Sequence, residues 1–282
     1  MLIFHESGRL GNQLFQYSAL KSLCKENESL ILLGFSQLQS VFDGLEAKII
    51  NHNSSRLERG FYYRLYRRLD FLSQKKIITT IQECTNSRRI IFNEGLLKQL
   101  TFVKESYFQN QKFFDPDVIK SFKLKPTLFQ YAQELLASIS QEKVLIFVNV
   151  RRGDYLTWPD KDNPAVLPAS YYQECIKIVN SKIFNPFFIF LSDDPFYVKD
   201  LFGYLENYYI SLGSSFEDFA IMTQCQGGIL SASTFAWWGA YFAKLTYPKA
   251  FFFAPKYWAG HRIKSWYPPM IESDFLTYID LL

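Results

Sequence analysis

Two adjacent arginines and an aspartate directly follow an apolar run in the second half of the chain. The stretch reads "KVLIFVNVRRGDY" and carries Arg151, Arg152 and Asp154. A guanidinium group binds phosphate oxygens through two parallel hydrogen bonds and keeps its charge at every ordinary pH. Arginines at the end of a strand therefore indicate a diphosphate site, against the alternative of a purely structural network of arginine and aspartate.

A second polar turn lies near the start of the chain, in "ESGRLGNQLFQYSAL". Gly8 and Gly11 permit positive φ angles and let a ligand approach the main chain, and the amides that open the following helix attract anions. Asn12 and Gln13 add polar side chains to the same turn. The spacing matches neither a GxGxxG nor a P-loop motif. It therefore indicates a phosphate or sugar site on equal terms with an ordinary turn before a capped helix.

Two further loops carry residues suited to a nucleotide. In "FLSDDP", the residues from Ser192 to Pro195 follow an apolar stretch, where they suit the cap of a helix or a contact with a ribose or base, and capping is the favoured interpretation. In "SASTFAWWGA", Ser233 and Thr234 precede a helical stretch. Either residue is a candidate cap for a helix whose first turn faces the same crevice.

The elements that must position these residues are clearest in the second half of the chain. From Lys143 onward, apolar stretches such as "KVLIFVNV", "PFFIFLS" and "AFFFAP" alternate with helical ones such as "PASYYQECIKIVNSKI". This alternation is typical of a parallel sheet covered on both faces. Such a doubly wound sheet binds ligands at the carboxyl ends of its strands. In the first half, "SLILLGF" predicts another strand, whereas residues 41–93 show no clear period and favour irregular or helical structure.

The composition is that of a globular protein. Of 282 residues, 48% are hydrophobic and 18% aromatic, enough for one large core or two modest ones. No apolar run is long enough to span a bilayer and no secretory signal is recognisable, so we expect a cytoplasmic protein. The four cysteines, Cys24, Cys84, Cys175 and Cys225, lie far apart, and the chain has three histidines. We expect reduced thiols, with neither a disulfide framework nor a structural zinc site.

The formal charge of +4 is unevenly distributed. Residues Arg56 to Lys76, "RLERGFYYRLYRRLDFLSQKK", combine five arginines and two lysines with several aromatic residues. One interpretation is a solvated helix whose aromatic side chains pack inward. Another is a peripheral contact with anionic lipid or a polyanionic acceptor. Nucleic-acid binding is the third, and we expect no such partner because no recognised reader motif accompanies the basic stretch.

Six motifs extend in order along the chain from Gly8 to Trp258. They read "GRLGNQLFQYSAL", "ESYFQNQKFF", "VNVRRGDY", "FLSDDP", "DFAIMTQCQGGILSASTFAWWGAYF" and "APKYW". Together they resemble the bacterial α-1,2-fucosyltransferases of glycosyltransferase family 11, with only about residues 35–100 unmatched. The resemblance implies a GT-B-like α/β fold of two Rossmann-like halves with doubly wound parallel sheets. Residues 1–135 would form the acceptor-side half and residues 136–282 the half that binds the GDP-sugar.

The same resemblance implies an activity and its substrates. The enzyme would invert the anomeric centre of GDP-β-L-fucose and move L-fucose to the 2-hydroxyl of a galactose-type acceptor, without a metal ion and without a cofactor. The acceptor would be a galactose-containing oligosaccharide or a lipid-linked glycan, in surface glycan or O-antigen synthesis.

Individual residues also take roles from the resemblance. Asn12 would reach the donor diphosphate while Gly11 permits the approach, and Arg151 would hold the β-phosphate with support from Arg152 and Asp154. Trp237 and Trp238 would pack a helix onto the sheet. The implied donor-binding residues are Gly8, Gly11, Asn12, Gln13, Arg151, Arg152, Ser192, Asp193, Ser233, Thr234 and Phe235.

Two residues depart from the family pattern. Asn149 stands where relatives carry a histidine before the arginines, and Ala232 stands where an asparagine is common. An asparagine does not titrate, so a mechanism that makes this histidine the base cannot apply here. The departures keep open a noncatalytic relative that binds nucleotide sugars or glycans, or a member with an altered donor or acceptor.

The reaction also needs a carboxylate that accepts the proton of the acceptor hydroxyl. Asp160, in the loop "TWPDKDNPA", and Glu6, beside the glycine turn, are the candidates. The predicted catalytic residues are Arg151, Asp154 and Asp160.

Two pairs of aspartates have the DxD spacing of a metal site, Asp115 with Asp117 and Asp160 with Asp162. The arginines already supply positive charge for a diphosphate. We therefore expect Asp115 to cap a helix and the second pair to lie in a polar loop.

Overall fold

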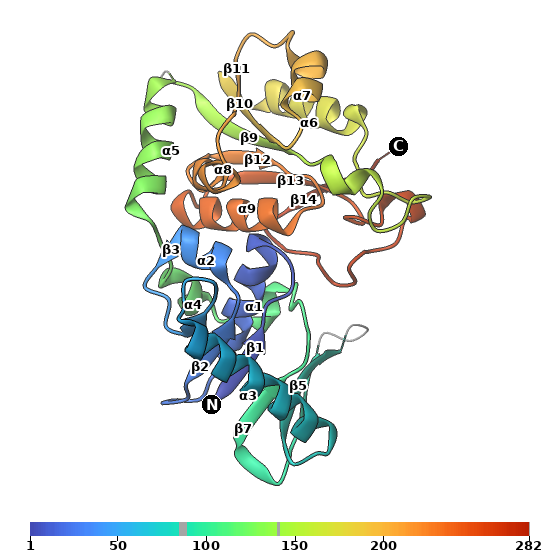
Figure 1. Ribbon diagram of the computed structural model, residues 1–282. Helices are drawn as coiled ribbons and strands as arrows, with labels where there is room; N and C mark the ends of the chain where they lie inside the picture. The colour runs from blue at the N-terminus through green and yellow to red at the C-terminus, as the bar shows by residue number, and fades with distance from the viewer. Residues whose placement is uncertain (85–88, 140–141, 282) are drawn as a thin grey trace. The chain divides into compact units, whose positions relative to one another are not determined.

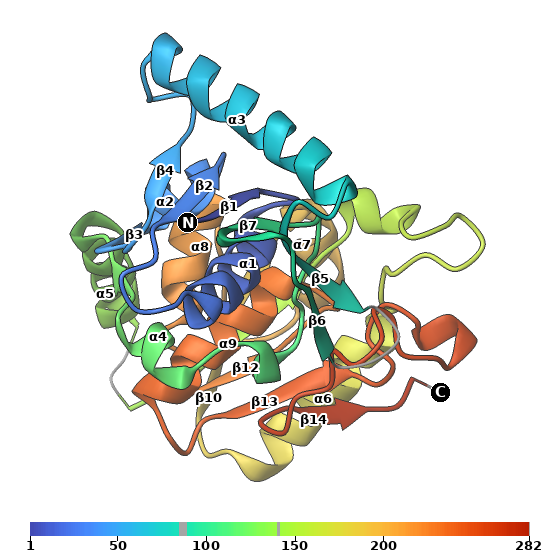
Figure 2. The ribbon, with the colours of Figure 1, turned by 90° about the horizontal axis from the view of Figure 1, so that it is seen from below.

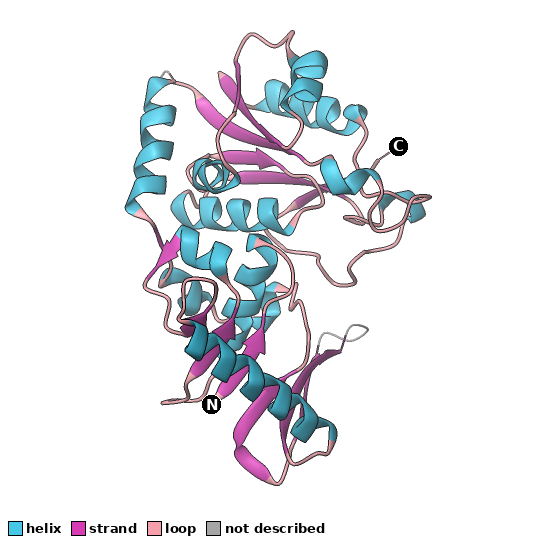
Figure 3. Cartoon of the chain, viewed as in Figure 1, coloured by secondary structure: helices cyan, strands magenta, loops and turns pink. Residues whose placement is uncertain are grey.

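The computed structural model describes residues 1–84, 89–139 and 142–281. It divides into two compact units, Met1–Lys125 and Pro126–Leu282, and each combines helices with strands (Figure 3). The predicted boundary after residue 135 falls inside helix α5 (Pro126–Ser138), which contacts α8 (Ser215–Met222) of the second unit. The first unit therefore ends at Lys125, earlier than predicted.

The first unit is built on a six-stranded sheet in the order β4-β2-β1-β7-β5-β6. All neighbouring strands are parallel except β5 and β6, which pair antiparallel. The strands are β1 (Leu2–His5), β2 (Leu30–Leu33), β4 (Lys48–Ile50), β5 (Ile78–Cys84), β6 (Arg89–Asn93) and β7 (Leu97–Val103). Strand β2 is buried along its whole length, as expected for a parallel strand covered on both faces.

Helices cover the two faces of this sheet, with α3 (Arg56–Gln74) on one and α1 (Leu10–Leu23) on the other (Figure 2). Helix α1 is buried over most of its surface. Two shorter helices, α2 (Ser36–Val41) and α4 (Pro116–Lys120), contact α1. A single 3₁₀ turn at Gln111–Phe113 and a small antiparallel pair, β3 (Phe42–Asp43) with β8 (Lys123–Leu124), complete the unit.

Helix α3 begins where Ser55 caps it, since the Ser55 side chain accepts a hydrogen bond of 3.2 Å from the Glu58 amide. Its inward side chains, among them Tyr62, Tyr66 and Leu69, pack against a core that includes Ile31 and Phe102 of the sheet. The stretch between residues 41 and 93 was predicted to be irregular or helical. It contains α3 but also strands β3 to β6, so that prediction was wrong for the strands.

The second unit is an all-parallel sheet in the order β11-β10-β9-β12-β13-β14. Its strands are β9 (Val144–Val150), β10 (Pro186–Ser192), β11 (Tyr208–Ile210), β12 (Gly227–Ile229), β13 (Phe251–Pro255) and β14 (Thr277–Ile279). Numbered within the unit, this order is 3-2-1-4-5-6, that of a dinucleotide-binding sheet. The predicted doubly wound parallel sheet is confirmed, and its order reverses between β9 and β12.

Helices α6 (Ala169–Lys182) and α7 (Pro195–Phe202) cover one face of this sheet, and α8 and α9 (Thr234–Thr246) cover the other (Figure 1). The α6 and α7 face buries Val148, Phe190 and Ile229 of the sheet against Tyr171 and Phe202. On the α9 face, Trp237 and Trp238 are fully buried, so the prediction that they pack the helix is confirmed. Two 3₁₀ turns lie at Gly153–Leu156 and His261–Ile263.

None of the four cysteines forms a disulfide, and Cys175 and Cys225 are buried while Cys24 and Cys84 are half-buried. Burial raises the pKa of the Cys175 thiol to about 12. Within the described part of the chain, no helix combines the length and the apolar character needed to cross a bilayer.

Candidate functional site

The arginine pair lies at the carboxyl end of β9, where the strand order of the second unit reverses. Strand β9 ends at Val150, and Arg151 and Arg152 follow directly. Neighbouring β12 ends at Ile229, so the loop of residues 230–233 leaves the sheet beside the arginines. In doubly wound sheets this position is the usual ligand-binding crevice. The structure thus brings together two loops that are about eighty residues apart in sequence.

Arg151 is held between two carboxylates. Its Nε and Nη2 donate to Asp154 Oδ1 at 3.1 and 2.5 Å, and Nη1 lies 2.8 Å from Asp193 Oδ2. The Arg151 side chain is 22% exposed, against 48% for Asp154. Asp193 thus fixes the inner side of the guanidinium group, and Asp154 covers its more exposed side. Displacement of Asp154 would free two parallel N–H groups for an anion.

The side chain of Arg152 contacts different neighbours from those of the Arg151 side chain. Its guanidinium carbon lies 3.5 Å from the centre of the Tyr197 ring, and its Nε donates to Asp194 Oδ2 at 3.0 Å. Its backbone amide donates to Asp193 Oδ1 at 2.9 Å. These contacts join the end of β9 to the start of α7, which makes Arg152 a positioning residue in this structure.

The loop after β10 has separate tasks for its three polar residues. The Ser192 hydroxyl donates to the Val150 carbonyl at 2.8 Å and accepts from the Asp194 amide at 3.0 Å, so it ties the loop to β9. Asp194 caps α7, because its Oδ1 accepts from the Tyr197 amide at 3.1 Å. The capping interpretation of "SDDP" is therefore confirmed, and Asp193 is left to hold Arg151.

Asn149 bridges two strands at the reversal point. Its Oδ1 accepts a hydrogen bond of 2.5 Å from the Ser231 hydroxyl, while its Nδ2 donates to the Leu191 carbonyl at 3.4 Å. The Asn149 side chain is buried, with 7% of its surface exposed. The amide therefore links β9 to the ends of both neighbouring strands.

Two tyrosine hydroxyls fix the loop of residues 230–233 from either side. Tyr171 donates to the Leu230 carbonyl at 2.9 Å, and Tyr155 donates to the Ala232 carbonyl at 2.9 Å. The backbone at Ala232 is thus held although the residue has no polar side chain. A preorganised loop of this kind keeps backbone amides in place for a ligand.

The first turn of α9 follows this loop. Ser233 occupies the N-cap position but its side chain forms no cap hydrogen bond, so the predicted cap by Ser233 is wrong as a side-chain contact. Thr234 and Phe235 are half-buried, and the Phe235 ring lies 5.4 Å from that of Phe219 in α8. Helix α9 thus starts directly after the loop that leaves the carboxyl end of β12, and the role of these three residues in donor binding stays a prediction.

Sequence reasoning missed Asp218, an acid on the inward side of α8. Its Oδ1 accepts from the Ser211 hydroxyl at 2.6 Å, directly after β11. Burial raises the pKa of Asp218 to about 7, and the Ser211 hydrogen bond opposes that rise. The signal was present in "FEDFAIM", where Asp218 shares the helix face of Ile221 and Met222. A perturbed carboxyl at this edge of the sheet is a candidate for function.

In the first unit, the constrained glycine of the opening turn is Gly8. It has a φ of +87°, and a Cβ there would lie 2.2 Å from Asn12 Nδ2. Gly11 belongs to α1 and is not among the residues with positive φ, so of the two glycines only Gly8 uses the conformational freedom that the sequence offers.

Most described groups at the start of α1 are occupied by the protein itself. The Leu10 amide donates to Gln37 Oε1 at 2.8 Å, and the amides of Asn12 and Gln13 donate to the Arg9 carbonyl. Gln13 is buried, accepts from the Leu38 amide at 2.8 Å and donates to the Gly8 carbonyl. We conclude that Gln13 shapes the turn. The prediction that the amides at the start of the helix point to an anion is wrong for those of Leu10, Asn12 and Gln13, which donate to protein oxygens.

Asn12 joins the two motifs of the first unit. Its Oδ1 accepts from Gln109 Nε2 at 2.8 Å. Gln16 adds a second link, since its Nε2 donates to the carbonyls of Ser7 and Ser106 at 3.0 and 3.2 Å. The motifs "GRLGNQLFQ" and "ESYFQNQ" therefore form one hydrogen-bonded cluster at the carboxyl ends of β1 and β7.

Glu6 directly precedes Ser7 of this cluster in the sequence and is half-buried. Its carboxylate accepts a hydrogen bond from the Phe35 amide. Burial raises the pKa of Glu6 above its ordinary value, while the Phe35 amide and the nearby His5 oppose that rise. A carboxylate whose pKa is raised by burial is a stronger base than an ordinary carboxylate and is therefore suited to accept a proton.

Asp160, the other candidate base, lies in an exposed loop. Its Oδ1 accepts from the amides of Asp162 and Asn163 at 2.9 and 2.8 Å. Its described contacts therefore hold its own loop, as expected for the second DxD pair. Asp115 caps α4 through the Asp117 amide, as predicted, and Asp117 pairs with Lys120 at 2.7 Å. Within the described residues, no group of three or more metal-ligating side chains comes together.

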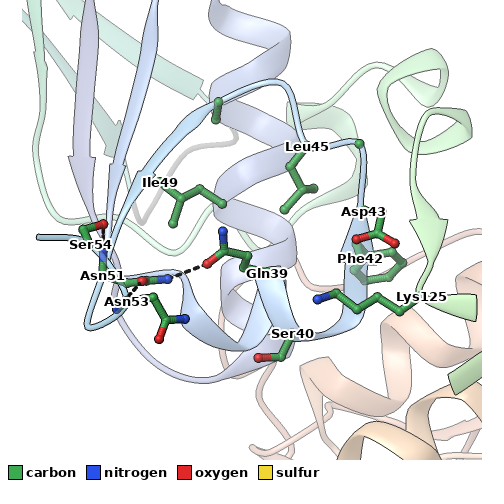
Figure 4. Close-up of a pocket in the computed structure, with 12 residues that line it drawn as sticks. Gln39, Ser40, Phe42, Asp43, Leu45, Ile49, Asn51, Asn53, Ser54 and Lys125 are labelled. Carbon is green, nitrogen blue, oxygen red and sulfur yellow. Dashed lines mark hydrogen bonds between the residues drawn. The ribbon is translucent and has the colours of Figure 1, made fainter. Parts of the chain in front are cut away.

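A polar hollow of about 620 Å³ lies beyond the end of β4 in the first unit (Figure 4). Asn51, directly after the strand, forms its buried wall. Its Nδ2 donates to Gln39 Oε1 at 2.7 Å and its amide donates to the Ser54 hydroxyl at 3.2 Å. Asp43 and Lys125 line the opposite side of the close-up (Figure 4). Polar amides and hydroxyls of this kind suit the hydroxyl groups of a sugar.

A comparison with known protein families assigns the chain to one of them. The sequence model of Glycosyl transferase family 11 matches residues 3–259. The chain belongs to glycosyltransferase family 11. The resemblance expected from the six motifs is therefore confirmed.

Relatives of this family 11 protein come from bacteria and mammals. The O-antigen biosynthesis glycosyltransferase WbnK of Escherichia coli is 26% identical over 92% of this chain and 95% of WbnK. The galactoside α-(1,2)-fucosyltransferase 2 of Rattus norvegicus is 27% identical over 45% of this chain, and the chain spans 39% of the rat protein.

A solved structure supports the fold. The fucosyltransferase NodZ from Bradyrhizobium matches with a TM-score of 0.52 and 14% identity, over 88% of this chain and 92% of NodZ. NodZ α-1,6-fucosyltransferase soaked with GDP-fucose matches with a TM-score of 0.51 at 13% identity. Together with the two α/β units, this similarity gives the family 11 chain a GT-B-like fold, as expected.

The structure explains how this family 11 chain accommodates Asn149, which departs from the family pattern. The position faces Ser231 and the Leu191 carbonyl, so a side chain here can hold neighbouring strands without taking a proton. At Ala232, the backbone carbonyl accepts the Tyr155 hydroxyl and needs no side-chain amide. Both departures are thus accommodated by hydrogen bonds within the second unit.

Proposed function

We propose that this family 11 chain is an inverting fucosyltransferase. It would move L-fucose from GDP-β-L-fucose to the 2-hydroxyl of a galactose-type acceptor and form an α-1,2 linkage. The observation that carries this proposal is Arg151 at the reversal point of a dinucleotide-binding sheet, with its guanidinium group already oriented by Asp193. The match to family 11 and the names of relatives supply the sugar and the linkage.

The donor half of the reaction needs stabilisation of a leaving diphosphate. Negative charge grows on that group as the bond to the anomeric carbon breaks, and a preorganised guanidinium group stabilises it by several kcal/mol in typical enzymes, on the order of 3 kcal/mol per donor. In our proposal, Arg151 exchanges its more exposed partner Asp154 for the β-phosphate. Amides of the loop of residues 230–233 and of the α9 start support the same charge.

The acceptor half needs a base and a sugar site. Glu6 and Asp160 remain the candidate bases, and the pKa of Glu6 is raised by burial. The cluster around Asn12 and the hollow beside Asn51 offer polar side chains to a glycan. We propose a galactose-containing oligosaccharide or lipid-linked glycan as acceptor, in cytoplasmic synthesis of a surface glycan.

The donor role of the second unit needs no metal in this proposal. Arg151 and helix amides supply the positive charge that a divalent ion supplies in DxD enzymes. No cofactor is required beyond the donor substrate itself.

The proposal is tested by a panel of nucleotide sugars offered with a small set of galactosides. We expect transfer from GDP-L-fucose alone, with NMR showing an α linkage to the galactose 2-hydroxyl. Retention of the β configuration, or transfer from a UDP-sugar, would contradict the proposal. GDP binding without turnover on any galactoside would favour a noncatalytic nucleotide-sugar-binding relative, which the departures at Asn149 and Ala232 motivate.

A further inference from the structure

The side of helix α3 that faces away from its sheet is apolar and basic at once. Leu57, Phe61 and Phe71 point outward, with exposed fractions of 87%, 61% and 58%. Tyr62, Tyr66 and Leu69 on the inward side already pack against the sheet. The helix therefore does not need its outward apolar residues to hold its place in the first unit.

Cations interleave with these apolar residues. We define the α3 outer surface by the residues that share the outward side, Arg56, Leu57, Phe61, Arg64, Arg67, Arg68, Phe71 and Lys75. The two acids of the helix lie off this surface: Glu58 pairs with Lys48 at 3.2 Å, and Asp70 accepts from Gln74. Among the described residues, no carboxylate forms an ion pair with the arginines of the α3 outer surface.

A basic hollow adjoins the first half of the helix. It measures about 930 Å³ and is lined by Arg56, Arg59, Arg64, Arg68 and the nearby His52, besides Leu57 and Phe61. Guanidinium groups around an open hollow bind phosphate oxygens well. The hollow thus offers phosphate-binding groups beside side chains that prefer an apolar phase.

The apolar character continues beyond the helix. The Leu97 amide donates to the Ile77 carbonyl at 2.8 Å, which places the turn between β6 and β7 beside the segment that follows α3. Leu96 in this turn and Leu97, the first residue of β7, are 85% and 53% exposed. Lys75 and Lys76 come directly before Ile77. The carboxyl-terminal end of α3 therefore also has exposed leucines and cations close together.

We propose that the α3 outer surface docks on a bilayer that contains anionic lipid. Leu57, Phe61 and Phe71 would enter the boundary between headgroups and acyl chains, and the arginines would contact lipid phosphates. A helix of this length covers about 28 Å of membrane surface at 1.5 Å per residue. A bilayer fits better than a nucleic acid, because a leucine exposed at 87% gains nothing from base stacking but gains much from lipid.

Vesicle co-sedimentation of the full chain tests this docking without reference to enzymatic activity. The vesicles are pure phosphatidylcholine, or phosphatidylcholine with about a third phosphatidylglycerol. We expect binding to the second kind, weakened by added salt because the charge attraction is screened. Equal binding to both kinds, no sedimentation with either, or binding to single-stranded RNA in place of vesicles would overturn the proposal.

Matched variants test whether vesicle binding is specific to the α3 outer surface. Leu57→Ser with Phe61→Ser and Phe71→Ser should lower the partition coefficient by about tenfold or more, because the groups that enter the bilayer are lost. Arg64→Gln with Arg67→Gln and Arg68→Gln should give a similar loss and remove the salt dependence. Each variant changes exposed side chains, and circular dichroism checks that it folds.

The control variant changes apolar residues of the second unit that are equally exposed. Phe184, Phe196 and Leu212 have exposed fractions of 90%, 81% and 81%. Phe184→Ser with Phe196→Ser and Leu212→Ser should leave vesicle binding unchanged. Loss of binding in this control, or unchanged binding in both α3 variants, would show that another surface meets the membrane.

Discussion

Arg151 offers the sharpest test at the scale of single residues. Lysine keeps the charge but lacks the planar fork that Asp193 and Asp154 orient. We expect Arg151→Lys to lose about a hundredfold in turnover, nearly as much as Arg151→Ala, with a smaller loss in GDP affinity. Steady-state transfer and calorimetric GDP binding measure the two effects.

Arg262 provides the matched control for this substitution. It is an exposed arginine of the second unit whose Nε donates to the Pro164 carbonyl at 3.1 Å. Arg262→Lys should transfer fucose at the wild-type rate. An Arg151→Lys enzyme with comparable turnover would remove the guanidinium fork from the mechanism.

The identity of the base is a second question for single residues. Asp160→Asn should lower turnover by about a hundredfold with donor binding nearly unchanged if Asp160 takes the proton. Glu6→Gln should do the same if Glu6 takes it. The pKa of Glu6 is raised by burial, so a Glu6-dependent enzyme should lose activity at a higher pH, on acidification, than an ordinary carboxylate would allow. Near-normal turnover in either variant excludes that residue.

Asp218 should make stability depend on pH. Its pKa in the folded protein is about 7, against an ordinary value of 3.8. The proton is thus held more tightly in the folded state, and the stability it contributes is present below pH 4 and lost as the pH rises through 7. Asp218→Asn should flatten this loss, on the order of 4 kcal/mol at most.

Urea unfolding between pH 4 and 8 measures the effect at Asp218. The difference between wild type and Asp218→Asn should grow in favour of the variant as the pH rises. Parallel curves for the two proteins would mean that Asp218 ionises normally in the folded state.

Among the elements, the turn between β1 and α1 is constrained at Gly8. An alanine at this position would have to adopt a φ of +87°, and its Cβ would lie 2.2 Å from the side-chain nitrogen Nδ2 of Asn12. We expect Gly8→Ala to lower the free energy of unfolding by about 1 to 3 kcal/mol and to weaken transfer, because Asn12 must move. Thermal unfolding and steady-state kinetics report the two effects.

Gly44 is the control for backbone strain alone. Its φ is +73°, and nothing lies within 4 Å of a Cβ built there. Gly44→Ala should therefore lower the free energy of unfolding less than Gly8→Ala does. Equal effects of the two variants would mean that the Asn12 contact is unimportant.

How far the elements could be predicted differs between the two units. In the second unit, strands such as β9 and β10 are continuous apolar runs covered on both faces, so their signal is strong. In the first unit, β6 is largely exposed and lies at the edge of the sheet beside β5. Helix α3 places tyrosines inward and Leu57 and Phe61 outward. Its apolar residues therefore do not all lie on one face, and the helical periodicity in the sequence is weak.

At the scale of the whole molecule, the absence of a metal requirement is a prediction about activity. Transfer should survive EDTA, because Arg151 and backbone amides carry the charge that a divalent ion would otherwise supply. The measurement is turnover before and after chelation, followed by addition of manganese or magnesium. Activity that disappears in EDTA and returns with the metal would revive the DxD aspartates as ligands.

The candidate site could be predicted in its location but not in its pairings. That Arg151 ends a buried strand follows from the sequence, and so does its place at the carboxyl edge. Which acid holds it does not, because Asp193 and Asp194 are adjacent and only the start of α7 assigns one to the helix cap. The hydrogen bond from Gln109 to Asn12 joins two residues that are far apart in the sequence of the first unit, and no local sequence pattern specifies it.

The bridge from Asn149 to Ser231 has a consequence for how this family diverges. The two side chains form one hydrogen-bonded pair in a buried position, and an imidazole at residue 149 is larger than the amide and would place its ring nitrogens elsewhere, so residue 231 would have to adjust. Substitutions at the two positions should therefore covary among relatives. Relatives with histidine at the first position should lack serine at the second more often than chance allows. An evolutionary coupling of this kind would mark where the crevice can change its residues without losing its shape.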